Sequence, residues 1–294
     1  MSTIYNPYNQ RMGNYNPYLN TSNPILDTSR SLNTYQAPIP PSQFQNPNTY
    51  ARQHSPTFPL KGILSSLQGV FIKQKYQPEE VLTGWEAANK YYVYEMGQDG
   101  YKTGSKLLKC KEYSGCYQRA CCPADCRAFH MNCTNLFNMN SVSLKLIRDY
   151  QCTLCCLNRP EMQVIYSEEG VDMYFGKVVD NCDFCNYSFT IYDQSNRPLY
   201  VIEASCCQQG LLCGCPCQEC QIVEFELYKG ETGLRYPFKI IKNSPNCARS
   251  LAADVTNFSV PFPPEAGFQE RVLLMASALM IDYMMFEQAR RSFA

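Results

Sequence analysis

From about Gly62 onward, short runs of the chain alternate between apolar and polar residues, and turn-forming residues separate the runs. A period of two is typical of strands that bury one face, whereas a parallel sheet would show strands alternating with helices. The predicted strands cover residues 70–74, 91–95, 141–147, 162–166, 187–192, 199–203, 222–227 and 238–242. The pattern therefore predicts a mainly β domain, built as an antiparallel sandwich or barrel.

A single clearly helical pattern lies near the C-terminal end, and we expect a helix over residues 270–288. Residues 272–286 are apolar on every side except at Ser277 and Asp282. A membrane-spanning helix needs about 20 apolar residues, and an aspartate near the bilayer centre costs about 2.5–3.5 kcal/mol. The pattern favours a helix buried in the domain core, and a short membrane anchor that ends near Phe286 is the alternative.

Residues 1–58 are rich in Asn, Tyr, Pro, Gln and Ser and poor in Leu, Ile and Val. Such a segment buries too little apolar surface to offset the entropy of ordering it. We therefore expect a disordered tail, followed by a folded domain over residues 59–290. Pro38-Ile39-Pro40-Pro41 fits a PxxP pattern that an SH3-type partner could bind, and the alternative is a solvated tail that contains prolines by chance.

The charges limit the classes of partner and reaction. Lys plus Arg and Asp plus Glu each number 26, so the formal net charge is zero and we expect no nucleic-acid partner. Charged residues make up 18%, against roughly 25% in soluble proteins, which is consistent with a domain that rests on a membrane. The sequence has no phosphate-binding loop, dinucleotide fingerprint or nucleophile elbow, so we expect no enzyme.

The 18 cysteines need an explanation. Because the N-terminal residues do not form a secretory signal, we expect a reducing compartment and few disulfides. The remaining uses are acylation, metal binding and packing as small apolar side chains. The expected acylated residues are Cys152, Cys155, Cys156, Cys206, Cys207, Cys213, Cys215 and Cys217. Zinc is the rival ligand because CxxC pairs occur, but such pairs arise easily in a cysteine-rich chain, so we expect no zinc site.

Three segments resemble the phospholipid scramblase family, namely residues 81–91, 254–263 and 279–287, and they follow one another in the family's order. The resemblance implies a closed antiparallel tubby-like β-barrel around the C-terminal apolar helix. It also implies calcium-responsive, ATP-independent movement of phospholipid between leaflets, acylation, and a place on the cytoplasmic face of the plasma membrane. A homo-oligomer is one expected form. The alternatives are an acyl-anchored adaptor without transport activity and a cysteine-based metal-binding protein.

The resemblance places a calcium segment at residues 254–265, and calcium prefers several oxygen ligands. The candidate ligands are Asp254, Thr256, Asn257 and Glu265. The third loop position is a threonine instead of an acid, and the sixth is Ser259 instead of glycine, so we expect a weak Kd of about 10⁻⁴–10⁻³ M. The alternative is an ordinary connection between a strand and a helix, in which Phe258 and Phe262 pack on the barrel.

Overall fold

The computed structural model describes residues 60–75, 88–115, 126–137, 142–151, 153, 157–212, 219–243 and 256–286. The strands are β1 (Gly69–Gln74), β2 (Lys90–Met96), β3 (Lys102–Tyr113), β4 (Phe129–Asn135), β5 (Val142–Arg148), β6 (Glu161–Glu168), β7 (Val171–Asp180), β8 (Asn186–Asp193), β9 (Pro198–Ser205), β10 (Ile222–Lys229), β11 (Arg235–Asn243) and β12 (Asn257–Pro261). The helical elements are α1 (Leu60–Ser66), α4 (Gln209–Leu212), η1 (Glu219–Gln221), α6 (Phe268–Ile281) and the π-helical turn η2 (Asp282–Phe286). The tail predicted over residues 1–58 and its boundary lie outside the described ranges.

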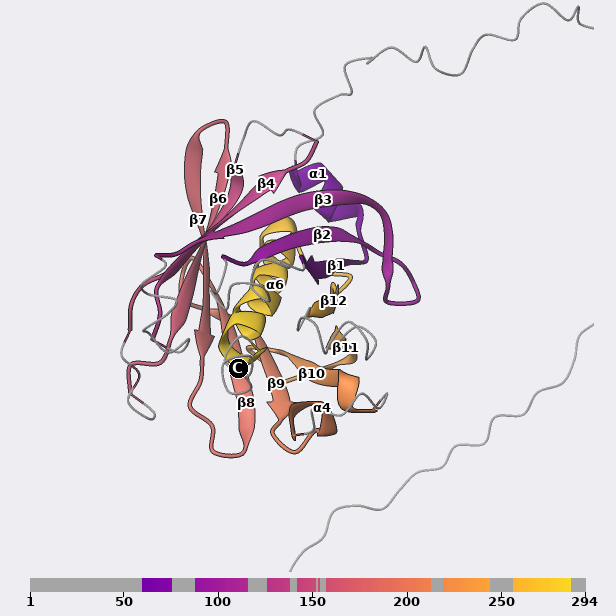
Figure 1. The fold of residues 1–294 in the computed structure, drawn as a ribbon, viewed down its shortest axis with the longest axis vertical. Coiled ribbons are helices and arrows are strands. Elements are labelled where there is room, and N and C mark those ends of the chain that lie inside the picture. Colours follow the sequence, from indigo (N-terminus) through magenta and orange to yellow (C-terminus); the bar gives the residue numbers. More distant parts are fainter. Residues whose placement is uncertain are drawn as a thin grey trace, which may run out of the picture. The chain divides into compact units, whose positions relative to one another are not determined.

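The twelve strands form a closed barrel in which each strand pairs antiparallel with its neighbours in sequence. The barrel closes where β1 pairs with β12, with Val70 opposite Val260 and Ile72 opposite Phe258. Closure removes the free sheet edges that would otherwise offer unpaired backbone groups. The prediction of a mainly β, closed antiparallel barrel is confirmed (Figure 1).

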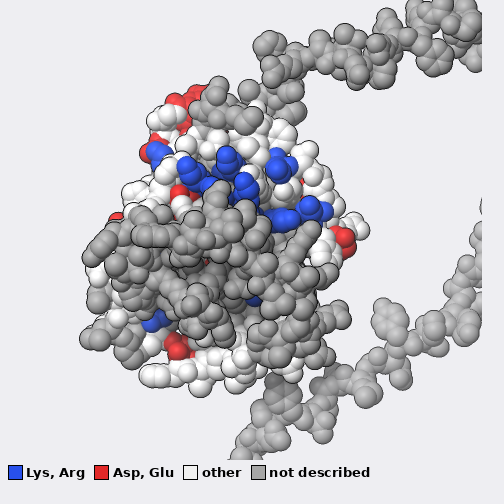
Figure 2. Space-filling model, viewed as in Figure 1, with Lys and Arg blue, Asp and Glu red and all other residues white. Residues whose placement is uncertain are grey.

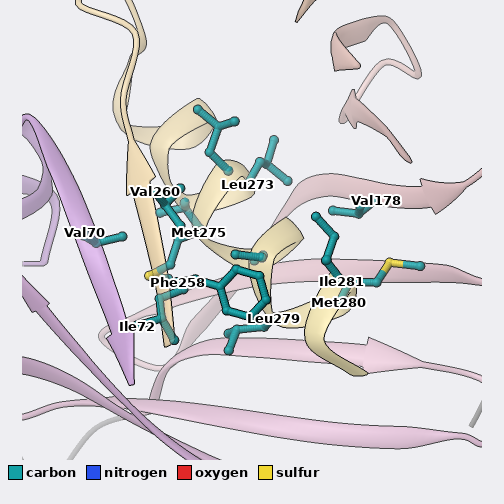
Figure 3. Packing of buried hydrophobic residues seen from close by; sticks show 14 of the residues in the cluster. Val70, Ile72, Val178, Phe258, Val260, Leu273, Met275, Leu279, Met280 and Ile281 are labelled. Atoms are coloured by element: carbon teal, nitrogen blue, oxygen red, sulfur yellow. The ribbon is translucent and has the colours of Figure 1, made fainter. Parts of the chain in front are cut away.

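Helix α6 lies inside the barrel and forms its core (Figure 1). Every residue from Arg271 to Ile281 is buried, as expected for a helix that is apolar on all sides. Figure 3 shows Leu279 and Met275 among Phe258, Val260 and Ile72 of the adjoining strands. The prediction of a buried core helix is therefore confirmed.

The helix begins and ends close to the predicted bounds. Gly267 donates its backbone N–H to the Glu270 carboxylate, which caps the first turn. Ser277 donates to the carbonyl of Leu274, so this buried hydroxyl is satisfied within the helix. Among the described helices, none is both long enough and apolar enough to cross a membrane.

Arg271 joins the start of α6 to the end of α1. Its guanidinium donates to the carbonyls of Leu64, Ser65 and Leu67 at 2.7–3.0 Å, and to the carbonyl of Ala266 at 2.8 Å. These carbonyls at the end of α1 have no partner within the helix. One buried cation therefore satisfies the C-terminal end of a seven-residue helix.

Cysteine pairing departs from the expectation, and both members of one disulfide lie among the described residues. Cys110 on β3 and Cys133 on β4 form a disulfide, and both are fully buried. They lie directly opposite each other in the antiparallel register, where Cβ atoms are about 4.5–5.5 Å apart. The expectation that disulfides are rare is wrong for this pair, because the strand pairing that brings the two sulfurs together is not visible in the sequence.

Candidate functional site

Asp282 lies at the C-terminal end of α6 and is fully buried, although it is a carboxylate inside an apolar barrel. The Tyr91 hydroxyl donates to Oδ2 of Asp282 at 2.6 Å. The Thr256 hydroxyl donates to Oδ1 at 2.5 Å. Two hydrogen bonds from the barrel wall therefore replace the water that this carboxylate loses on burial.

The contacts continue along the barrel wall from Thr256. Gln74 accepts through Oε1 from the backbone N–H of Thr256 at 3.1 Å, and the Thr256 hydroxyl oxygen lies 3.1 Å from the same atom. Its amide nitrogen donates to Oδ1 of Asn89 at 2.8 Å. Asn89 in turn donates to Oε2 of Glu112 through its backbone and side-chain nitrogens, both at 2.9 Å. This chain of contacts joins the wall strands β1, β2, β3 and the start of β12.

Basic and aromatic groups lie at the other end of this chain. Arg127 and Glu112 are both fully buried, with 3.9 Å between Nη2 and Oε1. Arg127 also donates to the Tyr283 hydroxyl and lies 4.8 Å from the centre of that ring. Phe129 contacts the same ring at 4.2 Å between centroids. The residue that follows Asp282 is thus fixed to the barrel wall as well.

We call this group the polar cluster. It consists of Gln74, Asn89, Tyr91, Glu112, Arg127, Thr256, Asp282 and Tyr283. Its members are buried, and they fix the C-terminal end of α6 to four parts of the barrel wall. The helix cannot leave the barrel unless Asp282 loses both of its hydrogen-bond donors, Tyr91 and Thr256.

The opposite end of α6 has its own tyrosine–carboxylate contacts. Tyr200 donates to Glu270 at 3.0 Å and Tyr236 donates to Glu265 at 2.6 Å. Burial raises the pKa of Tyr200, and the charge of Glu270 raises it further. The hydrogen bond from Tyr236 lowers the pKa of the Glu265 carboxyl. Hydrogen bonds from tyrosine hydroxyls to carboxylates therefore hold both ends of the helix.

The structure separates the predicted calcium ligands. Thr256 contacts Asp282 at one end of α6, whereas Glu265 precedes the other end. At 1.5 Å per residue, the helix from Phe268 to Asp282 is about 20 Å long. Glu265 and Thr256 therefore do not share one ion. Asp254 lies outside the described residues.

Residues 257–261 form the strand β12 instead of a ligand loop, and Phe258 and Phe262 are buried in the core. Phe258 and Phe262 therefore pack as expected for an ordinary connection between a strand and a helix. The side-chain oxygen of Asn257 is buried and has no hydrogen-bond partner in the structure. Among the described candidate ligands, it is a buried oxygen that an added cation could contact.

Two of the predicted acylated cysteines are described. Cys206 is half-buried and Cys207 is exposed, and their sulfurs lie 3.7 Å apart. The contact with Cys207 raises the pKa of the Cys206 thiol, which lowers its thiolate fraction at neutral pH. The other predicted positions, Cys152, Cys155, Cys156, Cys213, Cys215 and Cys217, lie outside the described residues.

The surroundings of these thiols are apolar. Cys206 donates its backbone N–H to the carbonyl of Cys185, an exposed free cysteine. Phe184 is 91% exposed and Leu212, at the end of α4, is 74% exposed. Large apolar side chains at such exposure are typical of a contact surface. No group of three His, Cys, Asp or Glu residues that could hold a metal ion occurs in the described part of the chain.

A surface hollow of about 390 Å³ lies over β8 to β11. Glu203, Glu224, Glu226 and Lys239 are among its lining residues. Lys239 pairs with Glu224 at 2.5 Å, and Arg235 pairs with Glu226 at 2.5 Å. The hollow is therefore largely neutralised by its own ion pairs.

The sequence pattern identified Asp282 and Thr256 but missed the rest of the polar cluster. Tyr91 falls inside a predicted strand, and the alternation along that strand places its side chain on the inner face. Gln74 is the last residue of another predicted strand and also faces inward. A polar residue at an inward position is a signal that sequence reasoning could have used. Glu112 lies on β3, which the pattern did not predict.

Comparison with known proteins extends these observations. A family model described as Scramblase matches residues 49–288. The chain is 27% identical to phospholipid scramblase 2 of Bos taurus over 228 residues, which cover 77% of this chain and 71% of that protein. It is 27% identical to phospholipid scramblase 1 of Homo sapiens over 225 residues, which cover 76% of this chain and 64% of that protein. The chain thus spans somewhat less than two thirds of the human relative. No solved structure matches the chain.

Proposed function

Because the chain belongs to the scramblase family, we propose that it moves phospholipids between the two leaflets of a membrane. The family match over residues 49–288 carries this proposal, since it includes the whole barrel and its core helix. The similar proteins from Bos taurus and Homo sapiens are both named phospholipid scramblases. We propose that the movement is independent of ATP, in line with the lack of nucleotide motifs in the sequence.

The position of α6 limits the mechanism. With Arg271 to Ile281 buried in the barrel, the closed domain acts on lipids from the membrane surface. Insertion of α6 would require the barrel to open and both hydrogen bonds to Asp282 to break. We propose that the closed barrel is the resting form, and that lipid movement involves opening of the domain or assembly of several copies.

Calcium is proposed as the trigger. Asp254 supplies a carboxylate in the segment that resembles the family's calcium segment. The unpartnered Asn257 oxygen supports a ligand position three residues later. Thr256 and Glu265 take part in other contacts, so the proposed site is poorer in ligands than the sequence alone predicted. This supports a weak affinity.

We propose that acylated cysteines attach the protein to the cytoplasmic face of a membrane, the plasma membrane being the expected one. Exposed Cys207 and half-buried Cys206 lie close to the exposed side chains of Phe184 and Leu212, which would enter the same lipid layer. Stable anchoring takes two signals, which neighbouring thiols can supply. SH3-type partners of the tail and homo-oligomers belong to the same proposal.

One observation favours a second candidate function. An apolar helix that is sealed inside the barrel is not available to the bilayer in the closed domain. An acyl-anchored adaptor, whose Tyr- and Pro-rich tail recruits signalling partners, would need no such helix. The two functions differ in whether the purified protein moves lipid.

Reconstitution of the full chain in liposomes with a fluorescent lipid tests the proposal. We expect lipid to reach the outer leaflet faster than in empty vesicles when millimolar calcium is added. The Asp254→Ala variant should need more calcium, with Asp149→Ala as an exposed control. If the protein moves no lipid under any calcium concentration, transport fails and the adaptor function survives.

A further inference from the structure

The outer face of β2 and β3 differs in charge from the rest of the barrel. Figure 2 shows lysine and arginine side chains gathered over these two strands, on the face that Figure 1 displays. The lysines of β3 are Lys102, Lys106, Lys109 and Lys111, and the first three are exposed. This face is positive although the whole chain has a formal net charge of zero.

A β-bulge brings these four lysines to one face. Val93 pairs with Leu108 but Tyr94 pairs with Lys106, so Leu107 is an extra residue in β3. Side chains alternate along a strand, so Lys106 and Lys109 would point to opposite sides if the strand were regular. The bulge reverses the alternation at Leu107, and both Leu107 and Leu108 are buried. The result is a stripe about 20 Å long, because Lys102 and Lys111 lie opposite Met96 and Lys90, which are six residues apart on β2 at about 3.3 Å per residue.

Tyrosine rings lie between the lysines. Lys106 Nζ is 4.4 Å from the centre of the Tyr92 ring, and Lys111 Nζ is 4.8 Å from that of Tyr113. Lys102 Nζ is 5.4 Å from the Tyr94 ring. Each ring contacts a lysine head, and none of the three tyrosines is fully buried. Tyrosine and lysine side chains of this kind suit the interface between water and lipid.

The four lysines of β3 lack carboxylate partners in the described part of the chain, whereas six basic residues elsewhere on the barrel have them. On β5 to β11, Lys145 pairs with Asp172, Lys177 with Glu161, Arg159 with Asp180, Arg197 with Asp193, Arg235 with Glu226 and Lys239 with Glu224. Beside the stripe, β4 presents His130, Asn132 and Thr134, none of which is acidic. The positive charge of β3 is therefore left for an external anion.

We propose that this outer face, with Lys102, Lys106, Lys109 and Lys111 among tyrosine rings, is a docking surface for a bilayer that contains anionic phospholipids. The face lies on the outside of a closed barrel, so it offers no groove for a duplex or an added strand. Lysine is a flexible point charge that can reach several phosphate groups without a fixed geometry. A charged surface with amphipathic rings fits a bilayer best.

This inference rests on the proposed function only in assuming that the protein meets a membrane. It adds which face of the barrel contacts the lipid. Half-buried Cys206 and exposed Cys207 follow β9, which lies about half-way around the barrel from β2 and β3. Acyl chains there would contribute to membrane attachment independently of the lysines. The test therefore uses the purified full chain without acylation.

Co-sedimentation with vesicles tests the surface. Wild type should bind vesicles of 70% phosphatidylcholine and 30% phosphatidylserine, bind pure phosphatidylcholine vesicles at least tenfold more weakly, and lose binding as salt rises. Each lysine near an anionic surface contributes roughly a fivefold effect, so Lys106→Gln/Lys109→Gln/Lys111→Gln should weaken binding roughly 20- to 100-fold. The matched control Lys145→Gln/Lys177→Gln/Lys239→Gln removes the same charge from β5, β7 and β11, where each lysine pairs with a carboxylate, and should lose less than fivefold. Glycerophosphoserine at equal phosphate concentration should not displace the protein.

Thermal unfolding should first show that both triple variants are folded. The docking-surface proposal is contradicted if both variants bind vesicles like wild type, or if both lose binding equally. It is also overturned if soluble headgroup displaces the protein as well as vesicles do. Lipid movement is measured separately on the same wild-type sample. If the protein binds vesicles but moves no lipid, the proposed function fails and the docking surface stands. If the protein moves lipid and the Lys106→Gln/Lys109→Gln/Lys111→Gln variant binds vesicles like wild type, the docking surface fails and the proposed function stands.

Discussion

The Tyr91 hydroxyl donates a 2.6 Å hydrogen bond to the carboxylate of Asp282, a residue 191 positions later in the chain. Tyr91 belongs to β2 and Asp282 begins the π-helical turn that ends α6. This contact, together with the one from Thr256, fixes the depth of the core helix inside the barrel. It also decides what happens when Asp282 is replaced.

Asp282→Ala should destabilise the domain by about 3–5 kcal/mol, because it removes the carboxylate to which two buried hydroxyl groups donate. Chemical denaturation followed by circular dichroism measures this change. Asp149→Ala, at an exposed position, should change the free energy of unfolding by less than about 0.5 kcal/mol. A loss at Asp282 as small as that of the control would contradict a structural role for the polar cluster.

Thr256→Val separates a structural role of this residue from a calcium-binding role. The valine keeps the shape but cannot donate to Asp282, so we expect a loss of about 1–3 kcal/mol in the presence of a calcium chelator. The loss should be the same with millimolar calcium. If the variant matches wild type in chelator and differs only with calcium, Thr256 is a ligand instead.

Arg271→Met should cost about 2–4 kcal/mol, since it removes the donor from buried carbonyls at the end of α1. Arg271→Lys should recover only part of the loss, because an ammonium cannot reproduce the planar contacts to Ala266 and to α1 at once. Thermal unfolding of both variants at one pH gives the comparison. Equal melting temperatures for wild type and Arg271→Met would rule out this account.

Tyr236→Phe should change the acid dependence of stability. The Tyr236 hydroxyl lowers the pKa of Glu265 in the folded protein, so its contribution is complete above the ordinary glutamate pKa of about 4.3 and is lost as pH falls through the lower folded pKa. The variant should lose about 0.5–1.5 kcal/mol at pH 7, and the difference from wild type should shrink toward pH 3. Melting temperatures between pH 3 and 7 measure it, with Tyr101→Phe at an exposed position as control. If the stability difference between Tyr236→Phe and wild type grows as the pH falls, this prediction is contradicted.

The sequence predicted the strands whose alternation is regular. Met162, Val164 and Tyr166 point inward along β6 with polar neighbours between them, and this strand was predicted correctly. Strand β3 was missed because the bulge at Leu107 breaks its period. Strand β7 was missed because its first four residues are all exposed and its register shifts near Gly176.

The candidate site was less predictable than the fold. Asp282 could be singled out because it interrupts an apolar helix, and its burial could be expected from the helix pattern. Its partners could not, because Tyr91 and Thr256 meet it only through long-range strand closure. The placement of Glu265 at the far end of α6 depends in the same way on β12, a strand that the calcium-segment interpretation treated as a loop.

The enclosure of α6 has a consequence for biosynthesis. Strands β1 to β11 leave the ribosome before the helix on which they pack, at about 5–20 residues per second. For several seconds, inward side chains such as Val93, Leu146 and Phe225 have no permanent core to cover them. The first strand also waits for the last one before the ring can close. Nascent chains of this protein should therefore depend on chaperones until translation has passed the helix, and a premature stop codon between the end of β2 and residue 268 should yield an insoluble product.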